Sequence, residues 1–373
     1  MRKPIFIALA SIGLVPVLFL VLSADTIRMI EPKIPFEPRT LVCYRAAGPV
    51  TVDGNLDEPV WDKASWSDPF ADIEGRSRAK PRFKTMVKLL WDDAYFYIGA
   101  YLEEPNVWAT QKDRDSVIYL DNDFEVELDP DGDSYNTYEL EINALNTVWD
   151  LFHINPYRDG RPANIQAWDI RGLQSAVLVN GTLNKPGDKD RSWFVEMALP
   201  WAVLQEAATP SAPPQAGDQW RVNFSRVEYR TAVADGNVVK AVDPATGKPY
   251  PEENWVWSPI GVDDIDYPEM WGYVQFSGKT AGKGRDSFVD RPEEKAKWLL
   301  RRVYYREWAW RAEKGTFTPD IKALGFAGKE LKVSGFSSPP ILQTTDRMFE
   351  ASLTATDGSV WRIRQDGRVG KDQ

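Results

Sequence analysis

The sequence predicts an all-β protein, a β-sandwich, with a small C-terminal α+β appendage. From about residue 41 to residue 278, short runs rich in aromatic and β-branched residues alternate with turn residues. Helical periodicity is nearly absent from this stretch. After it, a polar linker that contains glycine leads into a pattern typical of one long helix. These observations indicate a large sandwich over 41–278 and a helix with a few short strands over 290–373.

The first 24 residues have the pattern of an export signal. A basic start is followed by an apolar run over residues 5–22, and Ala24 is small enough for a cleavage site. Leu22 does not fit that site, so both a cleaved signal peptide and an uncleaved membrane anchor stay open. We therefore expect an exported protein of the periplasm, cell surface or extracellular space, in contact with a membrane only through an uncleaved leader. Cys43 is the only cysteine and is expected to be a small buried side chain.

Two hairpins are the clearest local predictions. Residues 85–90 and 95–101 are aromatic and β-branched, and the intervening Asp92 and Asp93 suit a tight turn. The second hairpin pairs DFEVELD (123–129) with YELEIN (138–143). Because side chains alternate along a strand, one face of this hairpin is apolar and the other is acidic. The acidic face carries Glu125, Glu127, Glu139 and Glu141.

The remaining strands are expected in shorter alternating segments, in two packed sheets. They span residues 147–154, 176–179, 193–199, 220–229, 256–258 and 272–276. Long loops over 155–172, 205–218 and 231–254 are rich in Pro, Gly and Asp, and loops of that length often carry function. Ligand sites are therefore expected there.

The helix is expected to begin at Asp290 as N-cap, with Pro292 early and Glu293 in capping-box register, and to end at Gly315. Its apolar stripe should pack on the sandwich or on a small sheet of its own. That stripe comprises Leu299, Val303, Tyr304, Trp308 and Ala309.

Composition excludes several functional classes. The net charge of −10 and the lack of a basic cluster argue against nucleic-acid binding. His153 is the only histidine, no serine lies in a nucleophile-elbow motif, and zinc and haem sites lack ligands. His153 lies in an apolar strand and is expected to be a hydrogen-bonded structural residue.

Two acidic groups leave alternatives open. The four glutamates could be a solvated face, a set of acceptors for sugar hydroxyls, a cation site, or the carboxylate pair of a glycosidase, whose members lie ~5–9 Å apart. The DPDGDS turn places Asp129, Asp131 and Asp133 around a glycine, which suits calcium, although a plain Asp- and Gly-rich turn needs no metal.

Aromatic residues form 12% of the chain and could stack on sugar rings. Six lie at expected strand ends or in loops: Tyr119, Trp149, Trp168, Trp255, Trp257 and Tyr267. Each of these rings could instead belong to the core.

Several segments together resemble carbohydrate-binding module family 9 and its larger exported relatives. They are VTVDGNLDEPVWDKA, VKLLWDDAYFYIGAYLEE, DNDFEVELDP, YELEINA, GDQWRVNFSRVE and NWVWSPIG with PEMWGYVQFS, in order over residues 49–277. The resemblance implies a DOMON-like, jelly-roll-type β-sandwich, structural calcium, and binding of small sugars or polysaccharide ends between two aromatic rings. The C-terminal part loosely resembles the globular end of type IV pilin-like proteins.

The resemblance also implies site residues. The first ring of the family's aromatic clamp falls on Tyr119, and a glutamate and an asparagine of the sugar site match Glu125 and Asn143. The family's arginine is replaced by Glu141. The family's glutamine falls on Ser225, beside Arg226, and the second clamp ring falls near Ile265, with Tyr267 as the nearest aromatic residue.

These observations predict non-catalytic carbohydrate binding by an exported module that serves polysaccharide uptake or breakdown. Its partners would be mono-, oligo- or polysaccharides. The alternative is a glycoside hydrolase, or an accessory protein of one, that acts on O-glycosyl bonds. The predicted sugar contacts are Tyr119, Glu125, Glu141, Asn143, Arg226, Trp257 and Tyr267, and the predicted calcium ligands are Asp129, Asp131 and Asp133.

Overall fold

The computed structural model describes residues 29–159, 163–208 and 211–371. The expected leader at 1–24 lies outside these residues. A large mixed sheet is formed by β1 (Thr40–Arg45), β2 (Ala71–Asp72), β3 (Thr85–Trp91), β4 (Tyr95–Glu103), β5 (Asp123–Asp129), β6 (Thr137–Asn143), β7 (Val148–Asn155), β8 (Ala163–Ile165), β9 (Gln174–Asn180), β10 (Ser192–Pro200), β11 (Gln219–Glu228), β14 (Glu253–Val256) and β15 (Gly272–Thr280). A small ribbon is formed by β12 (Thr231–Ala234) and β13 (Asn237–Lys240). Short 3-10 helices span Trp61–Lys63, Ile118–Leu120, Trp201–Glu206, Pro268–Met270 and Gly328–Leu331.

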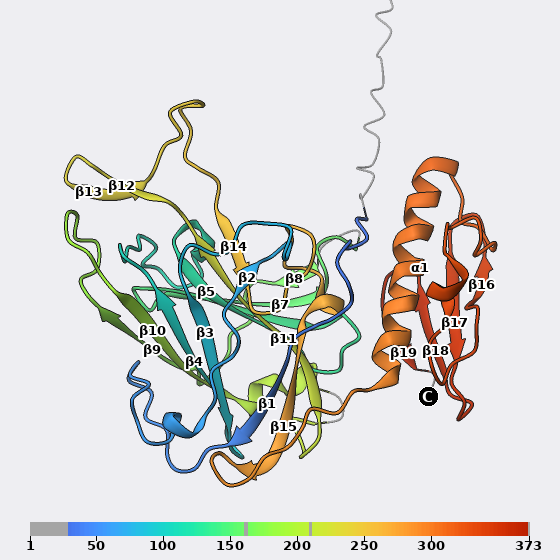
Figure 1. The fold of residues 1–373 in the computed structure, drawn as a ribbon, viewed down its shortest axis with the longest axis horizontal. Helices are drawn as coiled ribbons and strands as arrows, with labels where there is room; N and C mark the ends of the chain where they lie inside the picture. Colours follow the sequence, from blue (N-terminus) through green and yellow to red (C-terminus); the bar gives the residue numbers. More distant parts are fainter. Residues whose placement is uncertain (1–28, 160–162, 209–210, 372–373) are drawn as a thin grey trace, which may run out of the picture.

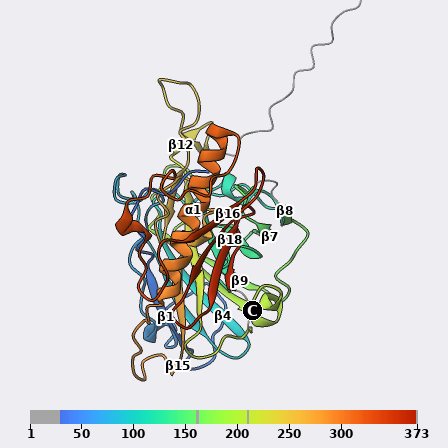
Figure 2. The same ribbon diagram turned by 90° about the vertical axis from the view of Figure 1, so that its right-hand side faces the viewer.

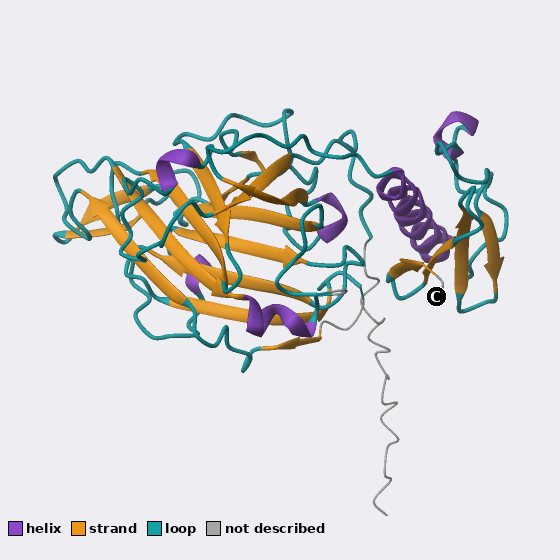
Figure 3. Cartoon of the chain, turned by 90° about the horizontal axis from the view of Figure 1, so that it is seen from below, coloured by secondary structure: helices purple, strands orange, loops and turns teal. Residues whose placement is uncertain are grey.

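The large sheet follows one continuous hydrogen-bonded path, β8-β7-β6-β5-β11-β15-β1-β3-β4-β10-β9, with β14 and β2 attached to β11. The sequence predicted two packed sheets, without a strand shared between them. Instead, β1 joins the two layers because it pairs in parallel with both β15 and β3. The path folds back on itself as a sandwich (Figures 1 and 3).

The core lies between the inward faces of β5 and β6 and those of β4 and β10. Phe124, Leu140 and Ile98 all belong to it and are at most 1% exposed. Trp201 stacks on Phe96 with ring centroids 5.6 Å apart. This packing confirms the predicted all-β sandwich.

Both predicted hairpins are confirmed. β3 pairs antiparallel with β4, and the Asp92 carboxylate accepts hydrogen bonds from the backbone of Ala94 and Tyr95 in the turn between them. β5 pairs antiparallel with β6, with Glu125 opposite Glu141 and Glu127 opposite Glu139. Cys43 is fully buried, as expected.

Some strands were not predicted or lie elsewhere. β1, β2, β8 and the β12–β13 ribbon were not among the predicted strands, and β14 ends at Val256, where the predicted strand was to begin. β2 and β8 are two and three residues long, and the ribbon has only four residues in each strand, too few for an alternating pattern to stand out. No helix in the described part of the chain is long and apolar enough to cross a membrane.

The C-terminal unit consists of α1 (Pro292–Lys314) and an antiparallel sheet of β16 (Ile341–Thr344), β17 (Phe349–Thr354), β18 (Val360–Arg364) and β19 (Val369–Lys371). The helix lies between the sandwich and this small sheet (Figures 1 and 2). It therefore buries more than the predicted stripe, including Leu300 and Tyr305, whereas the predicted Ala309 is exposed.

Only the N-terminal end of α1 differs from the prediction. Arg291, not Asp290, is the N-cap residue, and its side chain makes no capping hydrogen bond. Gly315 ends the helix with φ 83°, the left-handed conformation that glycine adopts most readily.

Polar and aromatic contacts join α1 to the sandwich. Glu294 accepts hydrogen bonds from Arg221 Nη2 at 2.8 Å and from the Tyr273 hydroxyl at 2.8 Å. Further along the helix, Tyr305 stacks on Tyr267 with ring centroids 6.0 Å apart. Lys297 and Arg221 hold the pKa of Glu294 at about 2 despite its burial. The C-terminal unit therefore contacts the sandwich through a network of charged side chains as well as through apolar packing.

A buried carboxylate on α1 predicts a pH dependence of stability. Glu307 is fully buried, accepts a hydrogen bond from the Thr318 backbone, and forms no ion pair among the described residues. Burial raises its pKa from 4.5 to about 7. The unfolded chain releases this proton more easily, so the contribution to stability is intact below pH 4.5 and is lost as pH rises to 7.

Between pH 4.5 and pH 8, the wild type should therefore lose about 2–3 kcal/mol of unfolding free energy more than Glu307→Gln. Urea unfolding at the two pH values measures this difference. Glu313→Gln, on the exposed side of the same helix, is the control and should behave as the wild type. Identical pH profiles for wild type and Glu307→Gln would contradict the assignment.

Candidate functional site

The acidic side of the β5–β6 hairpin is buried. Glu125 is 5% exposed, Glu127 2% and Glu141 2%, so the solvated-face interpretation is wrong. Loops from elsewhere in the chain cover this face of the sheet. The glutamates share a face because side chains alternate along a strand. This face is enclosed because other parts of the chain pack over it.

A pocket of about 440 Å³ opens on this face. Its walls come from β5, β6, β7, β11 and β14 and from loops and a 3-10 helix around them. The lining residues are Ile73, Tyr119, Glu125, Glu139, Glu141, Trp149, Leu151, Tyr157, Ser225, Val227, Glu252, Asn254, Asp264, Ile265 and Asp266. The volume is that of a small-ligand site.

One wall of the pocket is aromatic. Tyr119 is 44% exposed, and its ring centroid lies 6.2 Å from that of Trp149, with the ring planes tilted by 35°. The Tyr119 backbone N–H donates a hydrogen bond of 2.9 Å to Glu141 Oε2, which fixes the aromatic wall to the acidic floor. Tyr157 is also partly exposed and adds a third ring to the lining.

The floor of the pocket is rich in carboxyl groups. Oxygen atoms of the pocket residues Glu125 and Glu141 lie within 4.8 Å of one another and of an oxygen of Asp123, which is fully buried and does not line the pocket. Burial and the neighbouring Glu139 raise the pKa of Glu125 to about 7. Burial and the charge of Glu125 also raise the pKa of Glu141 well above its ordinary value.

Glu139 differs from its neighbours because it has a basic partner. His153 Nε2 lies in hydrogen-bonding contact with Glu139 Oε2, and His153 is 2% exposed. Against the effect of burial, this contact lowers the pKa of Glu139 and raises that of His153. The expected hydrogen-bonded structural histidine is thereby confirmed.

The wall opposite the hairpin is acidic too. Asp264 accepts a hydrogen bond of 2.9 Å from the Asp266 backbone. Burial, together with nearby Asp264 and Glu139, raises the pKa of Asp266 to about 8 against the lowering effects of His153 and Arg158. Negative groups therefore face the pocket from two sides.

Four predicted sugar contacts lie outside this pocket. Asn143 is fully buried, where its amide donates to Gln111 O at 2.8 Å and its oxygen accepts from the backbone of Leu145 and Thr147. Arg226 is fully buried, with Nη2 2.8 Å from Glu104 Oε2 and 2.7 Å from Glu228 Oε2.

The other two are aromatic. Trp257 is 1% exposed and packs on Phe224 in the core. Tyr267 is 2% exposed and lies between Tyr305 and the guanidinium of Arg158. The structure therefore brings together only Tyr119, Glu125 and Glu141 of the predicted contacts, with Ser225 and Ile265 lining the same pocket. Ile265, near which the second ring of the family's clamp falls, lines the pocket with an aliphatic side chain.

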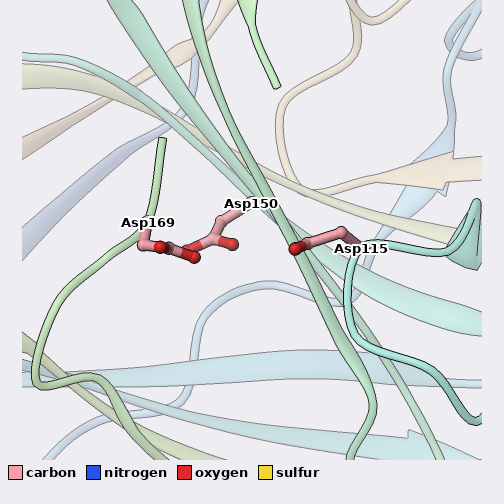
Figure 4. Close-up of side chains that lie close together, drawn as sticks. All are labelled: Asp115, Asp150 and Asp169. Carbon is pink, nitrogen blue, oxygen red and sulfur yellow. The ribbon is translucent and has the colours of Figure 1, made fainter. Parts of the chain in front are cut away.

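Three clusters of acidic residues in the described part of the chain could hold a metal ion. In two of these clusters an arginine already pairs with the carboxylates. The carboxylates of Asp115, Asp150 and Asp169 converge (Figure 4). Arg114 Nη2 bonds two of them, at 2.5 Å from Asp150 and 2.9 Å from Asp169.

The predicted calcium ligands form the second group. Asp129 accepts hydrogen bonds from the backbone of Gly132 and Ser134, and Arg368 Nε lies 2.7 Å from Asp133 Oδ2. Burial and Asp133 raise the pKa of Asp131 to about 6. The oxygen donors fit a hard cation, but Arg368 already offsets part of their charge. The third group is the floor of the pocket.

Sequence reasoning missed Tyr157, Asp264 and Asp266 as pocket residues. They lie in loops, and strand alternation places only residues within strands. The run VDDIDY, with three aspartates directly after the NWVWSPIG segment, was the available signal.

Comparison with known proteins identifies the family. The model of the carbohydrate family 9 binding domain-like family matches residues 52–248. Among solved structures, a putative carbohydrate-binding protein from Bacteroides uniformis is 14% identical and covers 65% of this chain and 100% of its own, with a TM-score of 0.46. A carbohydrate binding module family 9 from Caldicellulosiruptor kristjanssonii, in complex with cellotriose, is 15% identical, with 67% and 100% coverage and a TM-score of 0.41. The complex of a family 9 module from that organism with glucose is 16% identical, with the same coverage and a TM-score of 0.40.

No curated protein matches the chain. The family model, however, spans more than half of the 373 residues, and it includes the whole acidic hairpin and the aromatic wall of the pocket. The chain belongs to the carbohydrate family 9 binding domain-like family.

Proposed function

We propose that this protein binds carbohydrate, without transforming it, in the pocket above the β5–β6 hairpin. One observation carries the proposal: a cavity of about 440 Å³ combines an exposed aromatic wall with buried oxygen acceptors. Aromatic rings pack against the C–H faces of a sugar, and carboxylates accept hydrogen bonds from its hydroxyls. Family membership supports the same function.

The arrangement assigns a role to each side of the pocket. Tyr119 and Trp149 form an angled surface on which one sugar face can pack. Glu125 and Glu141 lie at the floor, where hydroxyl groups of that sugar would reach them. Because these acceptors are buried, their hydrogen bonds to a ligand are formed away from water and are correspondingly strong.

A thermal-shift screen of the full chain against mono- and oligosaccharides tests the proposal. A ligand that binds only the folded state raises the melting temperature by mass action. We expect one sugar class to raise it in the wild type but not in Tyr119→Ala. Trp66→Ala removes an exposed ring outside the pocket and should keep the response. No response to any sugar at millimolar concentration would contradict the proposal.

We further propose that the protein is exported and serves polysaccharide uptake or breakdown. The basic and apolar start of the sequence supports export. Mass spectrometry of the protein from a secreting host would distinguish a cleaved signal from a retained anchor. Recovery of the whole chain in the cytoplasm would contradict export.

A glycosidase is a second candidate because Glu125 and Glu141 lie directly opposite each other in the pocket. A pKa of about 7 would let Glu125 act as a general acid near neutral pH. Turnover of an oligosaccharide that Glu125→Gln abolishes, while binding is retained, would establish this activity. Our binding proposal predicts no turnover.

We also propose calcium as the cation for the Asp129–Asp131–Asp133 turn, because all the donors are carboxylate oxygens. Calcium should raise the melting temperature of the wild type, relative to a chelator, but not that of Asp131→Asn. Since Arg368 already pairs with Asp133, the shift should grow in Arg368→Ala. Equal melting temperatures with calcium and with chelator in all three proteins would rule out this site.

A further inference from the structure

The pocket has an unbalanced charge. Six of its lining residues are acidic: Glu125, Glu139, Glu141, Glu252, Asp264 and Asp266. Among the residues that the structure describes, no lysine, arginine or histidine lines it. A neutral sugar needs only a few acceptors for its hydroxyls, whereas a cationic ligand would favour the ionised form of the whole set of carboxyl groups.

The other acidic groups show what this pocket lacks. Arg114 binds the Asp115–Asp150–Asp169 group, and Arg368 binds the Asp129–Asp131–Asp133 group. No such partner accompanies Asp123, Glu125 and Glu141 within the described residues. Of the three carboxylate clusters, only this one has no arginine partner among the described residues.

Two buried carboxylate oxygens on β5 have no hydrogen-bond partner in the described part of the chain. Asp123 Oδ2 is buried without a hydrogen-bond partner, and so is Glu127 Oε1 on the same strand. Asp123 is fully buried and Glu127 is 2% exposed. Such groups need an explanation, and at Asp123, beside the pocket residues Glu125 and Glu141, a donor from a bound ligand would supply one.

We propose that the pocket binds a sugar with a free amino group, such as glucosamine, with its ammonium group on the floor and its ring on the Tyr119–Trp149 wall. This inference rests on the proposed carbohydrate-binding function. An ammonium group donates three hydrogen bonds of about 2.8 Å to carboxylates, which places the acceptors about 4.6 Å apart. In the pocket, oxygens of Glu125 and Glu141 lie within 4.8 Å of each other, and the buried Asp123, beyond the lining, adds a third carboxylate to this group. The neighbouring rings add favourable contacts to a cationic sugar.

Calorimetric titration of the full chain at pH 7 with glucosamine, N-acetylglucosamine, glucose and glucuronate tests this inference. We expect glucosamine to bind at least about tenfold more tightly than glucose, and glucuronate to bind more weakly than glucose. N-acetylglucosamine, which lacks the charge, should show no gain over glucose. This series compares ligands on the wild type and needs no folded variant.

Variants then locate the effect. The double variant Glu125→Gln/Glu141→Gln should lose the preference for glucosamine, whereas Glu206→Gln, outside the pocket, should keep it. Equal affinity for glucosamine and glucose would overturn the amino-sugar inference and leave the proposed function standing. Binding of none of the four sugars would overturn the inference, and failure of the wider saccharide screen would overturn the proposed function as well. Calcium chloride is titrated without sugar as a last control. If calcium binds the wild type but not the double variant, and the sugar series shows no preference for glucosamine, the floor is a metal site and the inference is overturned.

Discussion

Replacement of Arg226 by alanine is expected to lower the free energy of unfolding at pH 7 by about 3–5 kcal/mol. The guanidinium is fully buried between Glu104 and Glu228, both also buried. It also donates to Glu103 O at 2.9 Å and to Thr85 Oγ1 at 3.1 Å. Its removal leaves Glu104 in the sandwich without a counter-charge and Glu228 with only the more distant Arg82, 3.5 Å away, and this loss dominates the effect.

Urea unfolding of Arg226→Ala and of a matched control measures this difference. Arg230→Ala breaks an ion pair with Glu253 in which Arg230 is 51% exposed, and should cost at most about 1 kcal/mol. Because Arg226 lies outside the pocket, the folded fraction of Arg226→Ala should bind sugar as the wild type does. Weaker sugar binding with unchanged stability would instead place Arg226 in the binding site.

Replacement of Trp149 by alanine is expected to weaken sugar binding by about 10- to 100-fold, which corresponds to about 1.4–2.8 kcal/mol. Trp149 lies on β7, opposite Glu141 on β6, and its ring forms the aromatic wall with Tyr119. The ring is partly exposed, so its loss should affect binding far more than folding.

Calorimetric titration with the sugar class found in the screen measures the loss. Trp66→Ala is the control, because it also removes a partly exposed tryptophan but one that does not line the pocket. A Trp149→Ala protein that is folded by circular dichroism and binds with wild-type affinity would contradict the proposed aromatic wall.

Local patterns were sufficient for much of the fold. Alternation in DFEVELD and YELEIN placed Glu125 and Glu141 on one face, and the structure pairs them directly. Turn chemistry at Asp92 predicted the β3–β4 hairpin for the reason that the structure shows. These features depend on neighbours in sequence, which a single chain displays.

Burial and long-range contacts could not be predicted in the same way. Nothing near Tyr267 in sequence shows that Tyr305, from the C-terminal helix, stacks on it. Likewise, Arg226 and Asn143 have the chemistry of sugar contacts, but distant partners engage both of them inside the protein. The pocket is thus defined by which polar residues remain without internal partners, a property of the folded chain.

A crystal structure of the full chain with the best-binding sugar tests the central claim most directly. Our account predicts the sugar ring against Tyr119 and Trp149, with polar groups of the ligand in hydrogen-bonding contact with Glu125 and Glu141. A sugar bound elsewhere on the molecule, with this pocket free of it, would contradict the account.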